Sequence, residues 1–387
     1  MTNTAILAVS ALLVFAYLLD IFCRRTKLPA VVLLVATGMI GRQVMERLDL
    51  HLAWVNPLVP VIGTLGLILI VLEGALDLSL KRDKIPLVAR ASFSAVAGFL
   101  VCIALLTAAF HYAFALPLAA AALAAMPFAV ISSAVAIPNS VGLPADAREF
   151  IVYESSLSDI VGILVFYSWL QAHGSIGAFA TGLFGGGVVS LVLSVAAAIG
   201  LVYLINRVEG HVRFLPLLAG LTLIYAVGKQ LHLSPLIVIL VCGLLLNNTH
   251  LLRRAGRLDT ICKPGYADTL AEFKGLVAEL TFATKSFFFL MLGYWTDVQH
   301  MADWRAWAVM VAAVGAIYPA RLAILALLRQ PHARRVLWVA PRGLITVLLF
   351  LTAADSGQLD GFPFGAVMLL VLFTATATAL AHRAQKE

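Results

Sequence analysis

The sequence has few charged residues, and this scarcity excludes most soluble folds. Of its 387 residues only 12% are charged, whereas 62% are hydrophobic and the mean hydropathy is +0.99. A water-soluble domain cannot bury so much apolar surface, so the lipid bilayer is the expected solvent. The ten-residue alternating pattern of an outer-membrane barrel is also missing. The long apolar runs that fill the chain instead predict membrane-spanning helices.

Cysteines are few, and a signal-peptide pattern is missing. The four cysteines, Cys23, Cys102, Cys242 and Cys262, show neither metal-ligand spacing nor a disulfide framework, so no cofactor is expected. No basic region precedes the first apolar run and no clear cleavage site follows it, which favours a retained helix. The net charge of +7 comes mostly from short loops between apolar runs, which argues against a nucleic-acid partner.

The apolar runs predict an all-α polytopic membrane protein with no appended soluble domain. We count thirteen candidate spans, at about 4–22, 28–41, 58–80, 86–112, 116–138, 148–171, 176–206, 213–230, 234–248, 269–296, 303–329, 333–355 and 363–381. The second and ninth are short for a hydrocarbon core of about 30 Å, so we expect them to tilt or re-enter.

Basic residues are distributed unevenly between the two sides of the predicted spans. Eighteen Lys and Arg residues fall on one side, whereas only Arg42, Arg47, Lys229 and Arg305 fall on the other. Because cytoplasmic loops carry the excess of positive charge, we expect an N-terminus outside and a C-terminus in the cytoplasm. The membrane is then the cell (inner) membrane.

Two spans are interrupted by helix-breaking residues at matching places. The fifth contains Pro127, the run Ile131-Ser132-Ser133-Ala134 and Pro138, and the twelfth contains Ala340-Pro341-Arg342-Gly343. A proline kink explains one such break, but paired breaks point to a transporter built from inverted repeats. We therefore expect a single transporter domain, with a first repeat at about 1–171, a linker helix at about 176–206 and a second repeat at about 213–381.

The sixth span carries two carboxylates, and helical geometry gives them different surroundings. Ser155 and Asp159 are one turn apart and share a side of the helix, whereas Glu154 and Ser158 share another. Asp159 lies about 16 Å from the cytoplasmic start of the helix, near the middle of the bilayer. Charges at such depth are costly and usually functional. Asp159 is therefore the leading candidate for ion binding.

Glu154 lies about 9 Å from the same helix end, and a buried anion needs a cationic partner. Arg321 of span eleven lies at a comparable depth, so we interpret Glu154 and Arg321 as a structural ion pair. The alternative is that Glu154 itself carries the transported proton.

Further charged residues lie within the spans. Glu73 of span three lies about 10 Å from the cytoplasmic end, at the depth of Glu154. Arg342 beside the break of span twelve can balance helix-end dipoles or pair with an acid. Lys285 can pair with Glu279 of its own span or with the acidic cluster, and the sequence does not separate the two.

These residues narrow the chemistry to a hard monovalent cation. Such ions are held by carboxylates, hydroxyls and the carbonyl oxygens of unwound helix. Asp159, Ser155, Glu73 and the backbone near Ser132 and Ser133 supply this set. A carboxylate away from water can take up a proton near physiological pH, and the same group holds either the proton or the metal ion. That competition is sufficient for antiport.

Several motifs follow one another in a recognisable order. VLEGALDL lies at 71–78, and SSAVAIPNSVGLP is followed by ESSLSD around Asp159. FFFLMLGYW (287–295), YPARLAIL (318–325) and APRGLITVLLF (340–350) come later. Over nearly the whole chain, this order resembles the monovalent cation/proton antiporters, and most closely the electroneutral sodium/proton exchangers. The motifs resemble, in turn, the acidic third helix, the crossing helix, the ion-binding helix and later helices of that family.

The resemblance implies that Asp159 binds the cation and the proton, with Ser155 and Glu73 as co-ligands. It also implies the Glu154–Arg321 pair and alternating access by an elevator-like movement. The expected partners are Na+ or K+ and H+ as substrates, membrane lipid, and a second copy of the chain in a homodimer.

The sequence departs from the family pattern in three places. Ser158 precedes Asp159 where exchangers commonly have Asn and electrogenic members have a second Asp, so the single carboxylate favours one-for-one, electroneutral exchange. Ser132-Ser133-Ala134 stands where this branch usually has Thr-Asp-Pro; Ser-Ser also resembles potassium-type relatives, which leaves Na+, K+ and Li+ open. Lys285 stands where some members have Glu, which implies a modulating role.

We expect a secondary active antiporter of Na+ (or K+ or Li+) and H+. A cation channel is an alternative, but neither repeated filter loops nor rings of acids appear. A sodium-coupled carrier of a small organic anion needs more polar residues at the breaks than Asn139 and Ser140. A non-transporting membrane sensor fits less well, because the full set of ion-binding acids is present. An enzyme fits less well, because no nucleophile–base pair appears within the spans.

Overall fold

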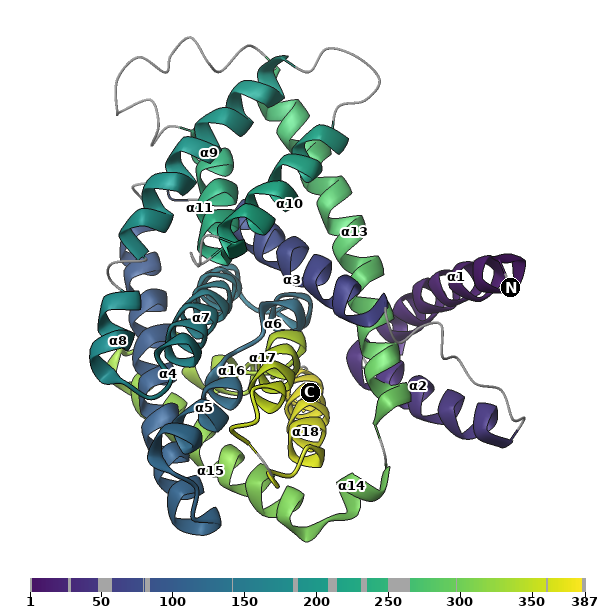
Figure 1. The fold of residues 1–387 in the computed structure, drawn as a ribbon, viewed down its shortest axis with the longest axis vertical. Helices are drawn as coiled ribbons and strands as arrows, with labels where there is room; N and C mark the ends of the chain where they lie inside the picture. Colours follow the sequence, from purple (N-terminus) through teal and green to yellow (C-terminus); the bar gives the residue numbers. More distant parts are fainter. Residues whose placement is uncertain are drawn as a thin grey trace.

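The structure of the protein is a computed structural model, and it describes residues 2–26, 29–47, 58–78, 80, 84–140, 142–183, 187–207, 214–230, 235–249, 265–296, 298–359 and 361–384 (Figure 1). Within these ranges the chain is helical apart from its connections, and no strand is present. The all-α fold expected from the sequence is confirmed. A helical fold is expected in a lipid bilayer, because backbone polar groups there must be paired within a helix or a closed barrel.

The helices follow the predicted apolar runs in order. They are α1 Thr2–Thr26, α2 Ala30–Arg47, α3 Leu58–Asp77, α4 Ile85–Phe114, α5 Leu118–Ala129, α6 Ser133–Asn139, α7 Ala145–Ala172, α8 Ile176–Thr181, α9 Gly187–Arg207, α10 Leu215–Gln230, α11 Pro235–Asn247, α13 Tyr266–Trp295, α14 Val298–Ala302, α15 Trp304–Leu327, α16 Ala333–Leu337, α17 Leu344–Asp355 and α18 Gly365–Ala384. The fifth and twelfth predicted spans are each split in two, as α5 and α6 and as α16 and α17.

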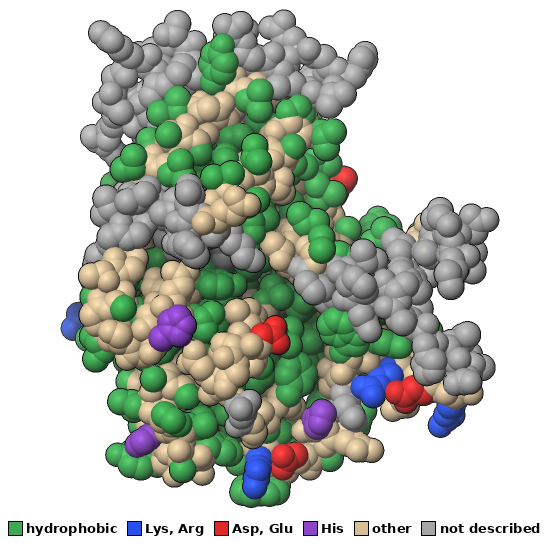
Figure 2. All heavy atoms as spheres, viewed as in Figure 1, with side chains coloured by type: hydrophobic (Ala, Val, Ile, Leu, Met, Phe, Trp, Pro, Cys, Tyr) green, Lys and Arg blue, Asp and Glu red, His purple; other side chains and the backbone are tan. Residues whose placement is uncertain are grey.

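Length and hydropathy agree with a membrane location. Among the described residues, five helical stretches are long and apolar enough to cross a bilayer: 85–114, 118–139, 145–172, 266–295 and 304–327. Shorter apolar helices accompany them, so the count of thirteen spans stays a prediction. Hydrophobic side chains cover much of the described surface in Figure 2, and few charged ones are visible among them.

The helices pack as two units that make few contacts with each other (Figure 1). The scaffold unit contains α1, α2, α3, α9, α10, α11 and α13, and α13 packs most extensively on α2 and on α3. The core unit contains α4 to α7 and α15 to α18, and α4 packs on α5, α7 and α15. The units meet where α7 lies against α3 and α11, where α2 lies against α18, and where α13 lies against α17. Each unit therefore combines helices from both halves of the chain.

Half of the eighteen basic residues behind the orientation argument lie outside the described residues. Those are Lys27, Lys81, Arg82, Arg213, Arg253, Arg254, Arg257, Lys263 and Lys386. Arg329, in the loop between α15 and α16, and Arg334 and Arg335, in α16, are described and exposed.

Two glycines allow α2 and α13 of the scaffold unit to touch backbone to backbone. A Cβ atom added at Gly38 would overlap the carbonyl oxygen of Leu290, and one added at Gly293 would overlap that of Val35. Close packing at small residues is a main source of helix association in lipid, where apolar burial provides little drive. This contact fixes α2 to the scaffold unit.

We expect Gly293→Leu to destabilise the protein by more than the roughly 1–3 kcal/mol typical of overpacking, because the clash falls on backbone. The fraction of monodisperse protein in detergent and the thermal unfolding midpoint measure the effect. Gly275→Leu is the matched control on the same helix, since a Cβ there meets open space. Equal behaviour of the two variants would contradict the close contact.

Candidate functional site

The two helix breaks cross each other in the core unit. After α5 the chain is extended at Val130 and again at Ser132, and α6 begins at Ser133. The second break runs from Trp338 to Gly343, between α16 and α17. The Ser132 amide donates a hydrogen bond to the Pro341 carbonyl oxygen at 2.9 Å. The breaks predicted in spans five and twelve are therefore present, and they are in direct contact.

Gly343 is the residue that permits this crossing. A Cβ atom at Gly343 would lie 2.6 Å from Ser132 Oγ and 2.9 Å from a methyl group of Val135. Both distances are shorter than side chains tolerate, so a larger residue would separate the breaks. The close contact with Ser132 and Val135 thus explains why a glycine stands at the end of the APRG motif.

Two side chains of α7 bind the backbone of the first break. Ser158 Oγ accepts a hydrogen bond from the Ile131 amide at 2.9 Å, and Asp159 Oδ2 accepts one from the Ser133 amide at 3.0 Å. Both α7 side chains are buried. Of the sequence-predicted ion-site residues, the structure thus joins Asp159 directly to Ser133 and places Ser158 one residue away.

Buried oxygen atoms without partners surround this junction. Within the described part of the chain, Asp159 Oδ1, Ser132 Oγ and Ser156 Oγ have no hydrogen-bond partner. A buried polar atom without a partner is costly, and each one in a folded protein calls for an explanation such as a bound ion. Oxygen atoms are also the ligands that hard cations prefer. The carboxylate and hydroxyl oxygens here suit a small monovalent cation.

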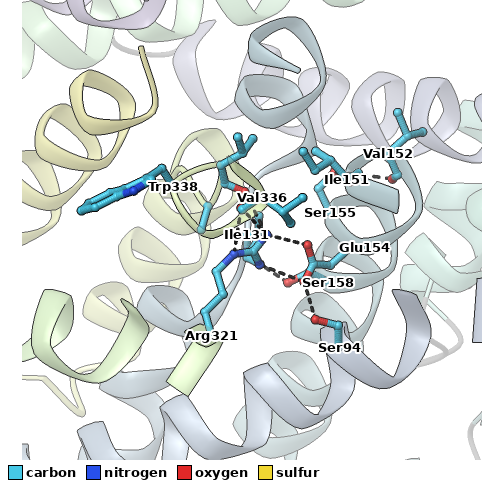
Figure 3. Close-up of polar contacts among 12 residues, drawn as sticks. Ser94, Ile131, Ile151, Val152, Glu154, Ser155, Ser158, Arg321, Val336 and Trp338 are labelled. Carbon is cyan, nitrogen blue, oxygen red and sulfur yellow. Dashed lines mark hydrogen bonds and ion pairs between the residues drawn. The ribbon is translucent and has the colours of Figure 1, made fainter. Parts of the chain in front are cut away.

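Ser155, predicted as a ligand, faces the backbone of its own helix. Its hydroxyl donates to the Ile151 carbonyl oxygen at 2.7 Å (Figure 3). Its oxygen still has a free lone pair to offer an ion, but in this conformation no hydrogen bond between Ser155 and Asp159 is present among the described contacts.

The ion pair predicted between Glu154 and Arg321 is present (Figure 3). Arg321 Nη1 donates to Glu154 Oε1 at 2.8 Å and Nη2 donates to Oε2 at 2.7 Å, so the pair is bidentate. Both side chains are buried, at 5% and 1% exposure. Ser94 of α4 donates a third hydrogen bond to Glu154, and Arg321 also donates to the carbonyl oxygens of Val336 and Val339. One charge pair therefore joins α4, α7, α15 and the second break.

Arg342 stabilises the end of α5 through carbonyl oxygens. Its guanidinium donates to Phe128 O at 2.9 Å, to Ala129 O at 3.3 Å and to Ala340 O at 2.7 Å. Of the two roles open from the sequence, these bonds favour balancing the negative end of a helix dipole. The Arg342 amide also donates to Thr374 Oγ1 of α18 at 2.9 Å.

A small cavity separates Arg342 from the Glu154–Arg321 pair. It measures ≈ 20 Å³ and is lined on its polar side by Ser94, Glu154, Ser158, Arg321 and Arg342. That volume accommodates about one water molecule, and the lining offers the several polar partners such a water needs. Ser158 thus lies between the Asp159 junction and the ion pair.

Glu73, the third predicted ligand, belongs to the scaffold unit. The positive charge of Lys285 on α13 acts on its carboxylate, but no ion pair between the two side chains is present among the described residues. The hydrogen bond that the Asp159 carboxylate accepts comes instead from the Ser133 amide. The structure therefore does not join Glu73 and Asp159 directly, and it leaves them on opposite units.

Sequence reasoning missed two groups at this site. Ser94 escaped notice because single serines are common in membrane helices. Thr374 and Thr378 of α18 bind the second break, since Thr378 Oγ1 donates to the Trp338 carbonyl oxygen at 2.9 Å. Their spacing of four residues puts both hydroxyls on one side of a helix, which is a usable signal.

Known proteins with a similar sequence or fold agree with this site. The sequence model of the family described as "Sodium/hydrogen exchanger, transmembrane" matches residues 9–382. A structure of the sodium proton antiporter MjNhaP1 from Methanocaldococcus jannaschii at pH 8 has a TM-score of 0.72 at 18% identity, and covers 100% of this chain and 97% of that one. A second structure of MjNhaP1 from the same organism, from an electron-microscopy map, has a TM-score of 0.70 at 20% identity, with the same coverage of both chains. No curated protein sequence matches.

The two kinds of likeness support different conclusions. At 18–20% identity the MjNhaP1 structures show a shared fold, so the antiporter-like fold predicted from the sequence is confirmed. The family match extends over nearly the whole chain and includes both breaks and Asp159. The chain therefore belongs to the transmembrane sodium/hydrogen exchanger family.

Proposed function

We propose that the protein exchanges Na+ for H+ across the cell membrane, and that Asp159 holds the two ions in turn. One observation carries the proposal: Asp159 is buried at the crossing of the two breaks, with Oδ1 left without a partner in the described structure. A proton on this oxygen, or a cation beside it, neutralises the same single charge. The two ions therefore compete for one site.

The ligand set follows from the neighbouring oxygens. Asp159 Oδ1 and Ser132 Oγ supply a charged and a neutral donor, and both lack other partners among the described residues. Ser155 contributes a hydroxyl on the same side of α7, and Ser133 and Ser158 hold the break in place through backbone amides. Glu73 lies on the opposite unit as the further acid of the pathway. Exchange of one cation for one proton is electroneutral, and Ser158 in place of a second acid supports this stoichiometry.

Movement of the core unit against the scaffold unit provides alternating access. The sparse contacts between the units support such an elevator-like movement, because few contacts have to be exchanged. The packing also supports two repeats at about 1–171 and 213–381 joined by 176–206. Under that correspondence, α2 on α13 is equivalent to α11 on α3, and α4 on α7 is equivalent to α15 on α18.

Orientation and assembly complete the proposal. The excess of basic loop residues on one side supports an N-terminus outside and a C-terminus in the cytoplasm. The family supports a homodimer in membrane lipid. Outside labelling of single cysteines at each terminus and the mass of the solubilised protein test these two statements.

The function is tested by reconstitution in liposomes that contain a pH-sensitive dye. With the membrane potential clamped, addition of Na+ outside is expected to move protons outward, and Li+ and K+ added in turn give the selectivity. Cation flux without proton movement would indicate a channel, and proton movement that needs an organic anion would indicate a coupled carrier. Either result would overturn the proposal.

A further inference from the structure

Ser156 of α7 has a buried hydroxyl group to which the ligand set of the proposed function gives no role. Serine and threonine hydroxyls inside helices commonly donate to the carbonyl oxygen four residues earlier, and the neighbouring Ser155 does so with Ile151. Ser156 is 3% exposed, yet its Oγ atom has no hydrogen-bond partner among the described residues. A buried hydroxyl without a partner costs free energy, so the missing bond calls for an explanation.

The position of Ser156 around the axis of α7 separates it from the helix breaks. At 3.6 residues per turn, Ser156 and Gly162 lie about 60° from Asp159, on opposite sides of it. On one side Gly162 packs on the first break, since a Cβ atom there would overlap a methyl group of Val130. On the other side Ser156 faces α3 of the scaffold unit, since a Cβ atom at Gly74 would lie 3.6 Å from Ser156 Oγ. Asp159 is thus flanked by the first break and by the seam along which α7 meets α3 and α11.

The seam is the side of α7 from which an ion can reach Asp159. The opposite side is closed, because Ser158 accepts a hydrogen bond from the Ile131 amide and Asp159 accepts one from the Ser133 amide. These bonds hold the first break against α7, whereas the core and scaffold units make few contacts along the seam. Movement of the core unit against the scaffold unit therefore opens the seam and leaves the bonded junction intact. A cation that enters there meets the Ser156 oxygen beside Asp159.

We propose that Ser156 binds the transported cation on the scaffold side of Asp159 and thereby sets the affinity for that cation. This inference deepens the proposed function and rests on it. A hard cation gives up water as it enters the protein, and a hydroxyl oxygen can replace one of those waters without adding charge. A proton on the Asp159 carboxylate needs no such ligand. Ser156 therefore favours the cation over the proton in their competition for one site.

The test is Na+-driven exchange by Ser156→Ala in liposomes that contain a pH-sensitive dye, at one alkaline pH. The half-saturating Na+ concentration is expected to rise about threefold to tenfold, which is the effect of losing one neutral hydrogen-bonding partner. The rate at saturating Na+ should stay that of the unmodified protein, because Asp159 still provides the charge. Ser156→Cys keeps the size of the side chain but replaces a hard oxygen with sulfur, so it should show the same rise.

The thermal unfolding midpoint separates this role of Ser156 from a structural one. Removing a buried hydroxyl that has no partner removes a cost of folding, so Ser156→Ala should unfold at the temperature of the unmodified protein or above it. Ser168→Ala is the matched control, because Ser168 is buried in the same helix but lies about 14 Å beyond Asp159 along the axis. It should leave the half-saturating Na+ concentration unchanged.

Three results would overturn the inference. They are an unshifted half-saturating Na+ concentration in Ser156→Ala, an equal shift in Ser168→Ala, and an unmodified affinity in Ser156→Cys. A lowered unfolding midpoint in Ser156→Ala would do the same, because the hydroxyl would then stabilise the fold. Absence of exchange by the unmodified protein would instead overturn the proposed function itself.

Discussion

Asp159→Asn is expected to reduce cation-driven proton movement to the level of protein-free liposomes. Asparagine keeps the size of the side chain and can still accept a hydrogen bond from the Ser133 amide, so the break remains in place. What it loses is the negative charge that either ion must neutralise. Exchange should therefore disappear while the folded yield stays near that of the unmodified protein.

Asp146→Asn is the matched control for this variant. Asp146 lies in the first turn of the same helix, and its side chain is 54% exposed. Removing this charge leaves the crossing of the breaks untouched, so exchange should persist. Undiminished exchange in Asp159→Asn, or equal losses in the two variants, would rule out Asp159 as the ion carrier.

Glu154→Gln is expected to cause the largest loss of stability of any single charge change in the core unit. It leaves the Arg321 guanidinium buried with no opposite charge, and breaking a buried pair from one side typically costs about 3–5 kcal/mol. The monodisperse fraction in detergent should fall sharply, and the surviving protein should unfold at a lower temperature. Replacing both partners, in Glu154→Gln/Arg321→Met, should recover part of the loss because no unpaired charge remains.

Glu149→Gln on the same helix is the control. Its salt bridge with Lys84 is 2.6 Å long but lies at the surface, at 43% and 29% exposure, where such pairs contribute about 0–1 kcal/mol. If Glu154→Gln folds as well as Glu149→Gln but loses all exchange, Glu154 carries the proton and the structural interpretation fails.

The parts of the fold that could be predicted from the sequence are those that depend on local order. Pro341 lies within the second break and Gly343 allows its close approach to the first, whereas Pro127 lies inside α5, three residues before the first break begins at Val130. The helical rise places Glu154 and Arg321 at the same depth. Because a buried acid needs a cationic partner, their pairing could be predicted from the sequence. The short helix α14 was not predicted, because five residues are too few for a periodic pattern.

The rest of the site depends on which helices are neighbours, and depth does not reveal that. Helical rise gives Glu73 and Glu154 the same depth, yet Glu154 binds Arg321 within the core unit whereas Glu73 belongs to the scaffold unit. From the sequence, Arg342 could either balance a helix dipole or pair with an acid, and only its three carbonyl partners in the structure distinguish the two roles. Likewise, the direction of the Ser155 hydroxyl is set by its χ1 rotamer, which a sequence does not encode.

The central claim is that one carboxylate binds either a cation or a proton. Calorimetric titration of the purified protein with Na+, repeated in buffers of different ionisation enthalpy, counts the protons released for each cation bound. The account predicts a release that approaches one proton per Na+ when the site starts protonated, and neither binding nor release in Asp159→Asn. Binding of Na+ without proton release, or release that persists in Asp159→Asn, would contradict it.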